Sequence, residues 1–294
     1  MSRRRVSAVL AALALAGTAP VLLPASNASA AACSSYPNWV AGKSYAAGDI
    51  VRYTDGKAYI AEHANPGYDP TISTWYWEPY ACDSGTPNAR FVVTEAQFNQ
   101  MFPNRNPFYT YSGLTAALSA YPGFAGTGSD TVKKQEAAAF LANVSHETGG
   151  LVHVVEQNTA NYPHYCDWSR PYGCPAGQAA YYGRGPIQLS WNFNYKAAGD
   201  ALGIDLLNNP WLVQNDAAVA WKTALWYWNT QTGPGTMTPH NAMVNGAGFG
   251  QTIRSINGSL ECDGKNPAQV QSRVNNYQRF TQILGTSPGG NLYC

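Results

Sequence analysis

The stretch Asp130–Gly150, with the sequence DTVKKQEAAAFLANVSHETGG, carries the strongest helix signal in this chain of 294 residues. Asp130 is a favourable N-cap residue, and Gln135 to Ala139 are strong helix formers. The glycines at 149 and 150 can end a helix and turn the chain back. The sequence therefore predicts a helix from Asp130 through Thr148.

This helix carries a candidate catalytic acid, Glu147. At 3.6 residues per turn, Glu147 lies on one face with Glu136, Phe140, Asn143 and Val144. Burial beside apolar groups and the negative end of the helix dipole both favour the protonated acid, the form that a general acid needs. We therefore predict that Glu147 is a general acid; the alternative is a solvated glutamate in an ordinary last turn.

A second carboxylate, Glu156, follows nine residues later. On one continuous helix it would lie about 13.5 Å further along and on the opposite face. Because Gly149 and Gly150 let the chain turn back, we expect Glu156 to face Glu147 across a groove. Inverting glycosidases separate two such carboxyls by about 6.5 to 9.5 Å and retaining ones by about 5 to 5.5 Å. The spacing in sequence leaves both possibilities open.

Other catalytic patterns are incomplete. His146-Glu147 could begin the zinc motif H-E-x-x-H, but residue 150 is glycine. Residues 183–188 lack the G-K-[ST] ending of a phosphate loop, and the chain has no G-x-S-x-G motif. We therefore expect no metal and no organic cofactor.

The composition excludes several classes of protein. Charged residues make up 12% of the chain, about half the usual share, and the net charge is +1. This balance excludes a nucleic-acid-binding surface over the whole molecule. No apolar run after residue 30 is long enough to span a membrane. We therefore expect that the protein binds neither nucleic acid nor a membrane. We also expect a monomer.

Residues 1–30 have the pattern of a signal peptide. Arginines at 3 to 5 precede an apolar run, and Ala28-Ser29-Ala30 offers a cleavage site. Gly17, Pro20 and Pro24 interrupt the run and disfavour a membrane anchor. We expect a secreted mature chain with 15 basic and 17 acidic residues.

The six cysteines all lie in this mature part. They allow 15 pairings, but their clustering along the chain favours the sequential one. We expect the disulfides Cys33–Cys82, Cys166–Cys174 and Cys262–Cys294.

Residues 31–82 read as a small β module closed by the first of these disulfides. Asp55-Gly56 between two strand-like runs is a hairpin signal. Side chains of a strand alternate between its faces, so Trp75, Tyr76 and Trp77 cannot all point inward, and exposed rings can stack on sugars. The alternative is that every ring is structural. Residues 83–88 read as a linker.

Residues 89–294 read as a mainly helical domain. Thr94 and Gln97 form a capping box, and Asp216 caps a helix with an apolar stripe that runs to Trp228. Further helices are expected at 239–245, 249–256 and 267–284. The segment 150–195 is rich in Tyr, Gly, Pro and Asn, and its length indicates a functional role.

Long motifs in this domain resemble the chitinases of glycoside hydrolase family 19, in their bacterial, short-looped form. They are His146-Glu147-Thr148-Gly149-Gly150, the run YGRGPIQLS at 182–190, the run DLLNNP at 205–210, Ala224-Leu225-Trp226, and Ile256-Asn257-Gly258 with Glu261-Cys262. The resemblance implies a lysozyme-like, two-lobed, mainly α fold. It also implies endo-hydrolysis, with inversion, of the β-1,4-linked N-acetylglucosamine polymer chitin, with fungal walls as one possible target.

The resemblance also implies roles for individual residues. Glu147 matches the family's general acid, Glu156 its general base, and Ser190 the residue that helps to hold the attacking water. The matching substrate-binding positions are Gln188, Asn194, Asn257, Arg273, Glu261 and Tyr172. Of these, Arg273 is expected to pair with Glu261, and Tyr172 stands where the family has a cleft tryptophan.

Residues 31–82 resemble the chitin-binding domains of carbohydrate-binding families 5 and 12. The matches include Trp39, Gly48-Asp49, Tyr59 and Trp75. Tyr68, Trp75 and Trp77 are the candidates for stacking on the polymer. Two alternatives to a chitinase remain at this stage: a peptidoglycan hydrolase, which shares the fold class, and a chitin-binding lectin without catalysis.

Overall fold

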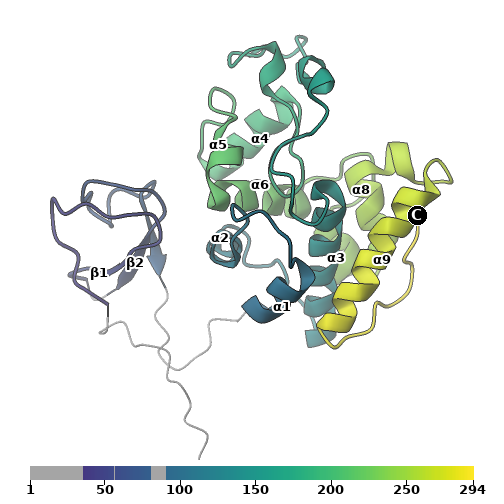
Figure 1. Ribbon diagram of the computed structural model, residues 1–294, viewed down its shortest axis with the longest axis horizontal. Helices are drawn as coiled ribbons and strands as arrows, with labels where there is room; N and C mark the ends of the chain where they lie inside the picture. The colour runs from purple at the N-terminus through teal and green to yellow at the C-terminus, as the bar shows by residue number, and fades with distance from the viewer. Residues whose placement is uncertain (1–35, 56, 81–90) are drawn as a thin grey trace, which may run out of the picture. The chain divides into compact units, whose positions relative to one another are not determined.

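The computed structural model describes residues 36–55, 57–80 and 91–294 (Figure 1). The contacts divide the chain into two units, Met1–Pro87 and Asn88–Cys294, and each is described by itself. The expected signal peptide, the Cys33–Cys82 disulfide and the linker at 83–88 lie outside the described residues.

The first unit holds a three-stranded antiparallel sheet in the order β1-β2-β3. Its strands are β1 (Ile50–Arg52), β2 (Ala58–Ala61) and β3 (Trp77–Tyr80). Val51 pairs with Tyr59, as the predicted hairpin requires, and Asp55 Oδ1 accepts a hydrogen bond from the backbone of Lys57 at 2.9 Å. The small core consists of Tyr45, Val51, Tyr59, Ala61 and Trp77.

The second unit is mainly helical, as predicted. Its α-helices are α1 (Glu95–Met101), α2 (Tyr111–Ala117), α3 (Asp130–Thr148), α4 (Asn192–Leu202), α5 (Leu212–Asn215), α6 (Ala217–Thr230), α7 (Pro239–Val244), α8 (Phe249–Glu261) and α9 (Pro267–Ile283). Short 3₁₀ turns lie at η2 (Leu118–Ala120), η3 (Thr159–Tyr165) and η4 (Gln178–Ala180). The capping box at Thr94 and Gln97 and the Asp216 cap are confirmed.

The helix α3 runs through the middle of this unit, with α9 alongside it (Figure 1). Every residue from Glu136 to Ser145 is buried, so the helix is enclosed on all sides rather than on the one predicted face. Alanines at 137 to 139 and 142 let neighbouring helices approach closely. The N-cap is Ser129, whose Oγ accepts from the Val132 N–H, so the Asp130 assignment was wrong by one residue.

The helix α8 is longer than predicted. It continues to Glu261 through Asn257, whose backbone leaves the helical region at φ −145° and ψ 27°. The Asn257 side chain donates to Glu261 Oε1 at 2.7 Å, so the pair stabilises the irregular turn that the sequence suggested was a helix end.

A tail at residues 289–294 lies against α8. The predicted disulfide Cys262–Cys294 fastens it, as Cys166–Cys174 closes a loop in segment 150–191. The Gly250 N–H donates to Asn291 O at 2.9 Å. A Cβ at Gly250 would lie 2.0 Å from Tyr293 O, so only glycine permits this close contact.

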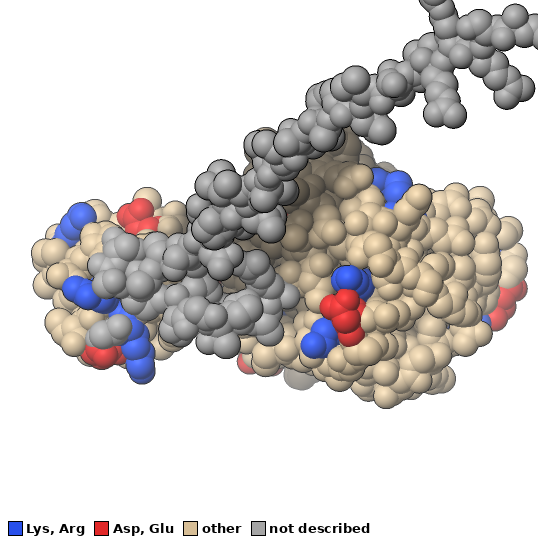
Figure 2. Space-filling model, turned by 90° about the horizontal axis from the view of Figure 1, so that it is seen from below, with Lys and Arg blue, Asp and Glu red and all other residues tan. Residues whose placement is uncertain are grey.

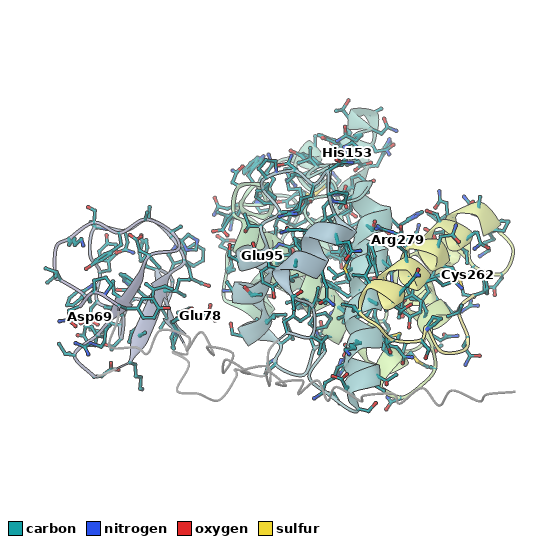
Figure 3. All side chains as sticks on the ribbon, turned by 60° about the horizontal axis from the view of Figure 1, so that its bottom comes forward. Asp69, Glu78, Glu95, His153, Cys262 and Arg279 are labelled. Carbon is teal, nitrogen blue, oxygen red and sulfur yellow. A yellow bond between two sulfur atoms is a disulfide. The ribbon has the colours of Figure 1, made fainter. Side chains whose placement is uncertain are left out.

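Charged side chains occupy scattered positions on the face shown in Figure 2. Some of them serve packing: Arg279 of α9 lies beside α1 in Figure 3 and donates to Met101 O at 3.0 Å. Within the residues that the structure describes, no helix is both long enough and apolar enough to cross a membrane.

Candidate active site

A cavity of about 610 Å³ opens in the helical unit where several of its elements meet. The end of α3, the segments 153–157 and 183–191, and the helices α4, α6 and α8 all contribute to its wall. The lining residues are Glu147, His153, Val155, Glu156, Gln157, Tyr165, Gly183, Ile187, Gln188, Leu189, Ser190, Trp191, Asn194, Tyr227, Ile256, Asn257 and Leu260. The two predicted catalytic carboxylates therefore share one cavity.

A left-handed turn produces this arrangement. Gly149 caps α3 at φ 62°, and Gly150 and Leu151 follow at φ 83° and 62°. Three successive residues in this region reverse the chain, which brings Glu156 back to the cavity that Glu147 lines. The sequence prediction of a turn at the glycine pair is confirmed.

Glu147 is held by a buried arginine. The Arg273 Nη2 group donates a hydrogen bond to Glu147 Oε1, and 19% of the Glu147 side chain remains exposed to the cavity. Arg273 also donates to Glu261 at 2.8 and 2.7 Å and to Asn143 Oδ1 at 3.0 Å. One guanidinium therefore connects α9, α8 and α3 behind Glu147.

Arg273 and Glu261 pair as expected, but the assignment of direct substrate contact was wrong for both. Both side chains are buried, and neither lines the cavity. Asn257 does line it and donates to Glu261. The arginine and the glutamate thus position Glu147 and Asn257 instead of touching a ligand.

Arg273 carries the positive charge that faces both Glu147 and Glu261. Burial opposes ionisation of Glu261, but the hydrogen bonds and charge of Arg273, with the Asn257 amide, hold its pKa below the usual range. Burial lowers the pKa of Arg273, and the charges of Glu147 and Glu261 outweigh it, so the net pKa is raised. One positive charge therefore serves two carboxyl groups.

Two other titratable side chains lie next to Glu147. His146 Nδ1 is 3.1 Å from Ser272 Oγ, and burial together with the charge of Arg273 lowers the pKa of His146. Tyr227 lines the cavity and donates to Ser255 O at 2.9 Å. Burial and the charge of Glu147 raise the pKa of Tyr227 to about 12, so its phenol stays protonated.

Neutral donors surround Glu156. Its Oε1 accepts from Asn161 Nδ2 at 2.8 Å and from the Tyr165 hydroxyl at 3.0 Å, and its Oε2 accepts from the Gly183 N–H at 3.3 Å. Burial and the bond to Glu156 raise the pKa of Tyr165 to about 12. The phenol therefore remains a donor, and the carboxylate is held without a direct cation partner among the described residues.

Segment 183–191 and the helix α4 supply three further predicted residues to the cavity. Gln188 adopts φ 51°, a left-handed conformation, and its Nε2 donates to Gly185 O at 3.0 Å. Asn194 Nδ2 donates to Ser190 O at 2.9 Å. Gln188, Ser190 and Asn194 line the same cavity as Glu156 and Glu147.

Tyr172 is not among the residues that line this cavity, and its role as a substrate contact stays a prediction. Its ring packs against the hydrophobic core, with Lys196 Nζ 5.9 Å from the ring centroid. Sequence reasoning also missed Asn143, Asn161, Tyr165 and Tyr227. Asn161 and Tyr165 lie in the segment 150–195, whose richness in Tyr and Asn was the only signal for them.

Over the described part of the chain, no group of three or more His, Cys, Asp and Glu side chains is arranged to hold a metal ion.

The small unit has its own exposed aromatic side chains. Tyr68 and Trp75 are 44% and 38% exposed, and the Trp75 ring stacks on His63 at 4.5 Å. Trp77 is only 1% exposed, so its assignment to a stacking surface was wrong. Its Nε1–H donates to Tyr68 O at 2.7 Å and its ring packs on Tyr45, because β3 turns this side chain into the core.

The helical unit matches known proteins closely. The family model described as Chitinase class I, Glyco_hydro_19, matches residues 92–294. Endochitinase A of Zea mays is 46% identical over 214 residues, which cover 70% of this chain and 72% of the relative.

Solved structures agree with this match. A bacterial family 19 chitinase is 86% identical, with a TM-score of 0.69, and the match covers 69% of this chain and 100% of that one. Chitinase C from Streptomyces griseus HUT6037 is 79% identical at the same TM-score, covering 69% of this chain and 98% of its own. The chain belongs to glycoside hydrolase family 19.

Proposed function

We propose that the protein is an endochitinase that cleaves β-1,4 linkages between N-acetylglucosamine units with inversion at the anomeric carbon. One observation carries the proposal: Glu147 and Glu156 line the same cavity in opposite environments. The first is bonded to a guanidinium whose charge another carboxylate already balances, whereas the second accepts only neutral donors.

Glu147 is suited to the role of general acid. Because Arg273 donates two hydrogen bonds to Glu261, its charge is largely balanced before Glu147 is counted. With Glu147 protonated, the cluster of the three groups is neutral, which suits a partly buried site. The protonated carboxyl can then donate to the glycosidic oxygen as the bond to the anomeric carbon breaks.

Glu156 is suited to the role of general base. Three donors orient its carboxylate toward the cavity, and none of them can itself donate a full proton near neutral pH. A water between Glu156 and the sugar loses a proton to this carboxylate while it attacks the anomeric carbon from the face opposite the leaving group. Ser190, which lines the same cavity, helps to hold this water.

The cavity also offers neutral groups for a neutral substrate. Gln188, Asn194 and Asn257 present amides, which match the hydroxyl and acetamido groups of N-acetylglucosamine. The position of Asn257 depends on Glu261, so substrate binding and acid positioning are mechanically linked.

A product time course on the N-acetylglucosamine hexamer tests the proposal. We expect internal cleavage and initial products in the α anomeric form by ¹H NMR. A β product would contradict inversion, and release of single sugars from one end only would contradict endo-cleavage. Glu95, an exposed residue of α1, gives a control variant, Glu95→Gln, that keeps the parent rate.

For the small unit, we propose that it binds chitin through Tyr68 and Trp75. Both rings are exposed, and the stack on His63 supports the Trp75 ring. Aromatic faces of this kind pack on the C–H faces of sugars.

In the full chain, Trp75→Ala should weaken binding to insoluble chitin by about tenfold, as expected for the loss of one stacking ring worth about 1.4 kcal/mol. Cleavage of short soluble oligomers should not change. Ile72→Ala is the matched control, because Ile72 is 78% exposed in the same segment but has no ring. Equal binding of the Trp75→Ala variant and the parent would overturn the assignment.

We also propose that the protein is secreted. The pattern of residues 1–30 supports this, and so do the two disulfides of the helical unit, which form and persist in oxidising surroundings. N-terminal sequencing of protein recovered from the culture medium tests the proposal, and retention of the unprocessed chain inside cells would contradict it.

A further inference from the structure

The structure contains a second buried arginine, Arg184, for which the mechanism above has no use. Its Nε donates to Gln214 Oε1 at 2.6 Å, and its Nη1 donates to Ala180 O and the Tyr195 hydroxyl, both at 2.7 Å. Its Nη2 has no hydrogen-bond partner among the described residues. No carboxylate in that part of the chain pairs with this guanidinium.

A buried charge without a counter-charge is costly, so its presence calls for a compensating use. The guanidinium lies flat on the Tyr182 ring, 3.6 Å from its centroid, which offsets part of the cost through a cation–π interaction. Gln214 accepts from both Arg184 Nε and the Tyr182 hydroxyl. A glutamate there could accept the same two bonds and neutralise the charge, yet the chain has a neutral amide.

Arg184 is physically connected to the Glu156 segment. Val155 and Arg184 form an isolated β-bridge, and the Glu156 N–H donates to Gly183 O at 2.8 Å. On the other side of the Tyr182 ring lies Tyr162, stacked at 3.6 Å and 10°. The Tyr162 hydroxyl donates to Glu156 O at 2.9 Å, so a stack of three planar groups ends at the backbone of Glu156.

The charges of Glu156 and Arg184 act on the same neighbouring tyrosines. Burial and the charge of Glu156 raise the pKa of Tyr162, and the charge of Arg184 opposes this rise. The pKa of Tyr195 is raised mainly by burial, with the same two opposing charges. The titratable and charged groups that face Glu156 are Tyr162 and Tyr165 from η3, Tyr182 and Arg184 from the loop, Tyr195 from α4, and Glu147 and His153 across the cavity.

We propose that Arg184 is a positioning residue for the general base: its stack with Tyr182 and Tyr162 fixes the Glu156 segment, and its buried charge, which no carboxylate of the described residues pairs with, lies next to that segment. The inference rests on the proposed function. Gln214 also has a role in this proposal. Because its side chain is neutral, it binds Arg184 without cancelling the Arg184 charge near Glu156.

The substitution Gln214→Glu tests this directly, because it keeps both acceptor bonds and adds the missing counter-charge. We expect the acid limb of the kcat profile to move to higher pH by about one unit, so that kcat below the midpoint falls about tenfold. KM should change little, and Tm should stay the same or rise. The control is Asn215→Asp, which adds a charge at the exposed neighbouring position and should leave the profile unchanged.

A second variant separates charge from packing. Arg184→Lys keeps the positive charge but loses the planar stack and the bond to Gln214, so we expect a lower Tm with the acid limb near its original position. An unmoved profile in Gln214→Glu, or an equal displacement in Arg184→Lys, would overturn the proposal. The α anomer from the parent enzyme is measured first, so these outcomes are distinguishable from a failure of the proposed function.

Discussion

The two buried arginines of the helical unit differ in their charge balance, and the difference follows the division of catalytic labour. Arg273 contacts two carboxylates, Glu147 and Glu261. Arg184 contacts none in the described residues and bonds to the neutral Gln214 instead. The arginine beside the proposed acid is thus neutralised, whereas the one beside the proposed base is not. A buried arginine therefore does not by itself set the charge at a neighbouring glutamate. The other residue that the arginine binds, Glu261 or Gln214, decides how much of its charge remains.

The largest effect is expected from removing the acid itself. Glu147→Gln keeps the size of the side chain but cannot donate a carboxylic proton, so hydrolysis of the hexamer should fall about 10³-fold or more. Binding should persist, since Arg273 retains Glu261. Initial rates and equilibrium binding of the hexamer check this, and turnover near the parent level would remove Glu147 from the mechanism.

Removing one of the two carboxylates that contact Arg273 should have an intermediate effect on activity. In Glu261→Gln, Glu147 becomes the only carboxylate on this guanidinium, which favours ionised Glu147 and removes the proton it must donate. The basic limb of the kcat profile should move to lower pH and kcat should fall about tenfold. The free energy of unfolding should drop by about 2 to 3 kcal/mol, as for a lost charged hydrogen bond.

Urea unfolding and the pH profile measure these two effects separately. Asp263→Asn is the control, because Asp263 pairs with Arg254 at an exposed position on the same side of α8. If the basic limb of Glu261→Gln coincided with that of the parent, the comparison between the two arginines would lose its electrostatic basis.

A third buried pair, Glu136 with His240, extends the comparison, and the expected effect of breaking it is smaller. Glu136 is buried and accepts from Trp228 Nε1 at 3.0 Å and Ala125 N at 2.9 Å, and His240 Nδ1 lies 2.6 Å from it. The hydrogen bond to Glu136 raises the pKa of His240, against burial and with the charge of Glu136. Here the counter-charge is itself titratable.

The raised pKa of His240 sets the sign of the pH effect on the free energy of unfolding. Protonated His240 stabilises the folded state fully below its ordinary value of about 6.5, and this contribution disappears as the pH rises through the raised folded pKa. His240→Asn should therefore lose about 1 kcal/mol of unfolding free energy at pH 6 and less at pH 9. His164→Asn, at an exposed position, is the control, and an equal loss at both pH values would contradict the ion pair.

The sequence predicted well whatever depends on local signals. The α3 helix, the glycine turn after it and the convergence of Glu147 and Glu156 on one cavity all follow from residues within 27 positions of one another. Family motifs placed Gln188, Ser190, Asn194 and Asn257 on the wall of that cavity.

Long-range partners could not be predicted in this way. Arg184 and Gln214 lie 30 residues apart, and Arg273 and Asn143 lie 130 apart, so no periodicity relates them. The alternation rule required one exposed ring in the row 75–77 but did not say which, and the choice of Trp77 failed for that reason. Likewise, Tyr172 was placed by its match to a cleft tryptophan of the family, and the match did not predict that its partly buried ring packs against the core.

The fastening of the 289–294 tail to α8 links the catalytic cavity to the redox state of its surroundings. The Cys262–Cys294 bond begins one residue after Glu261, and Asn257 lies one turn earlier on the same helix. A reductant that opens this bond leaves the tail on α8 only through non-covalent contacts, such as the hydrogen bond from the Gly250 N–H to Asn291 O. In a thiol-rich compartment the protein would keep both cavity glutamates but lose the covalent bond between its last residue and the end of α8.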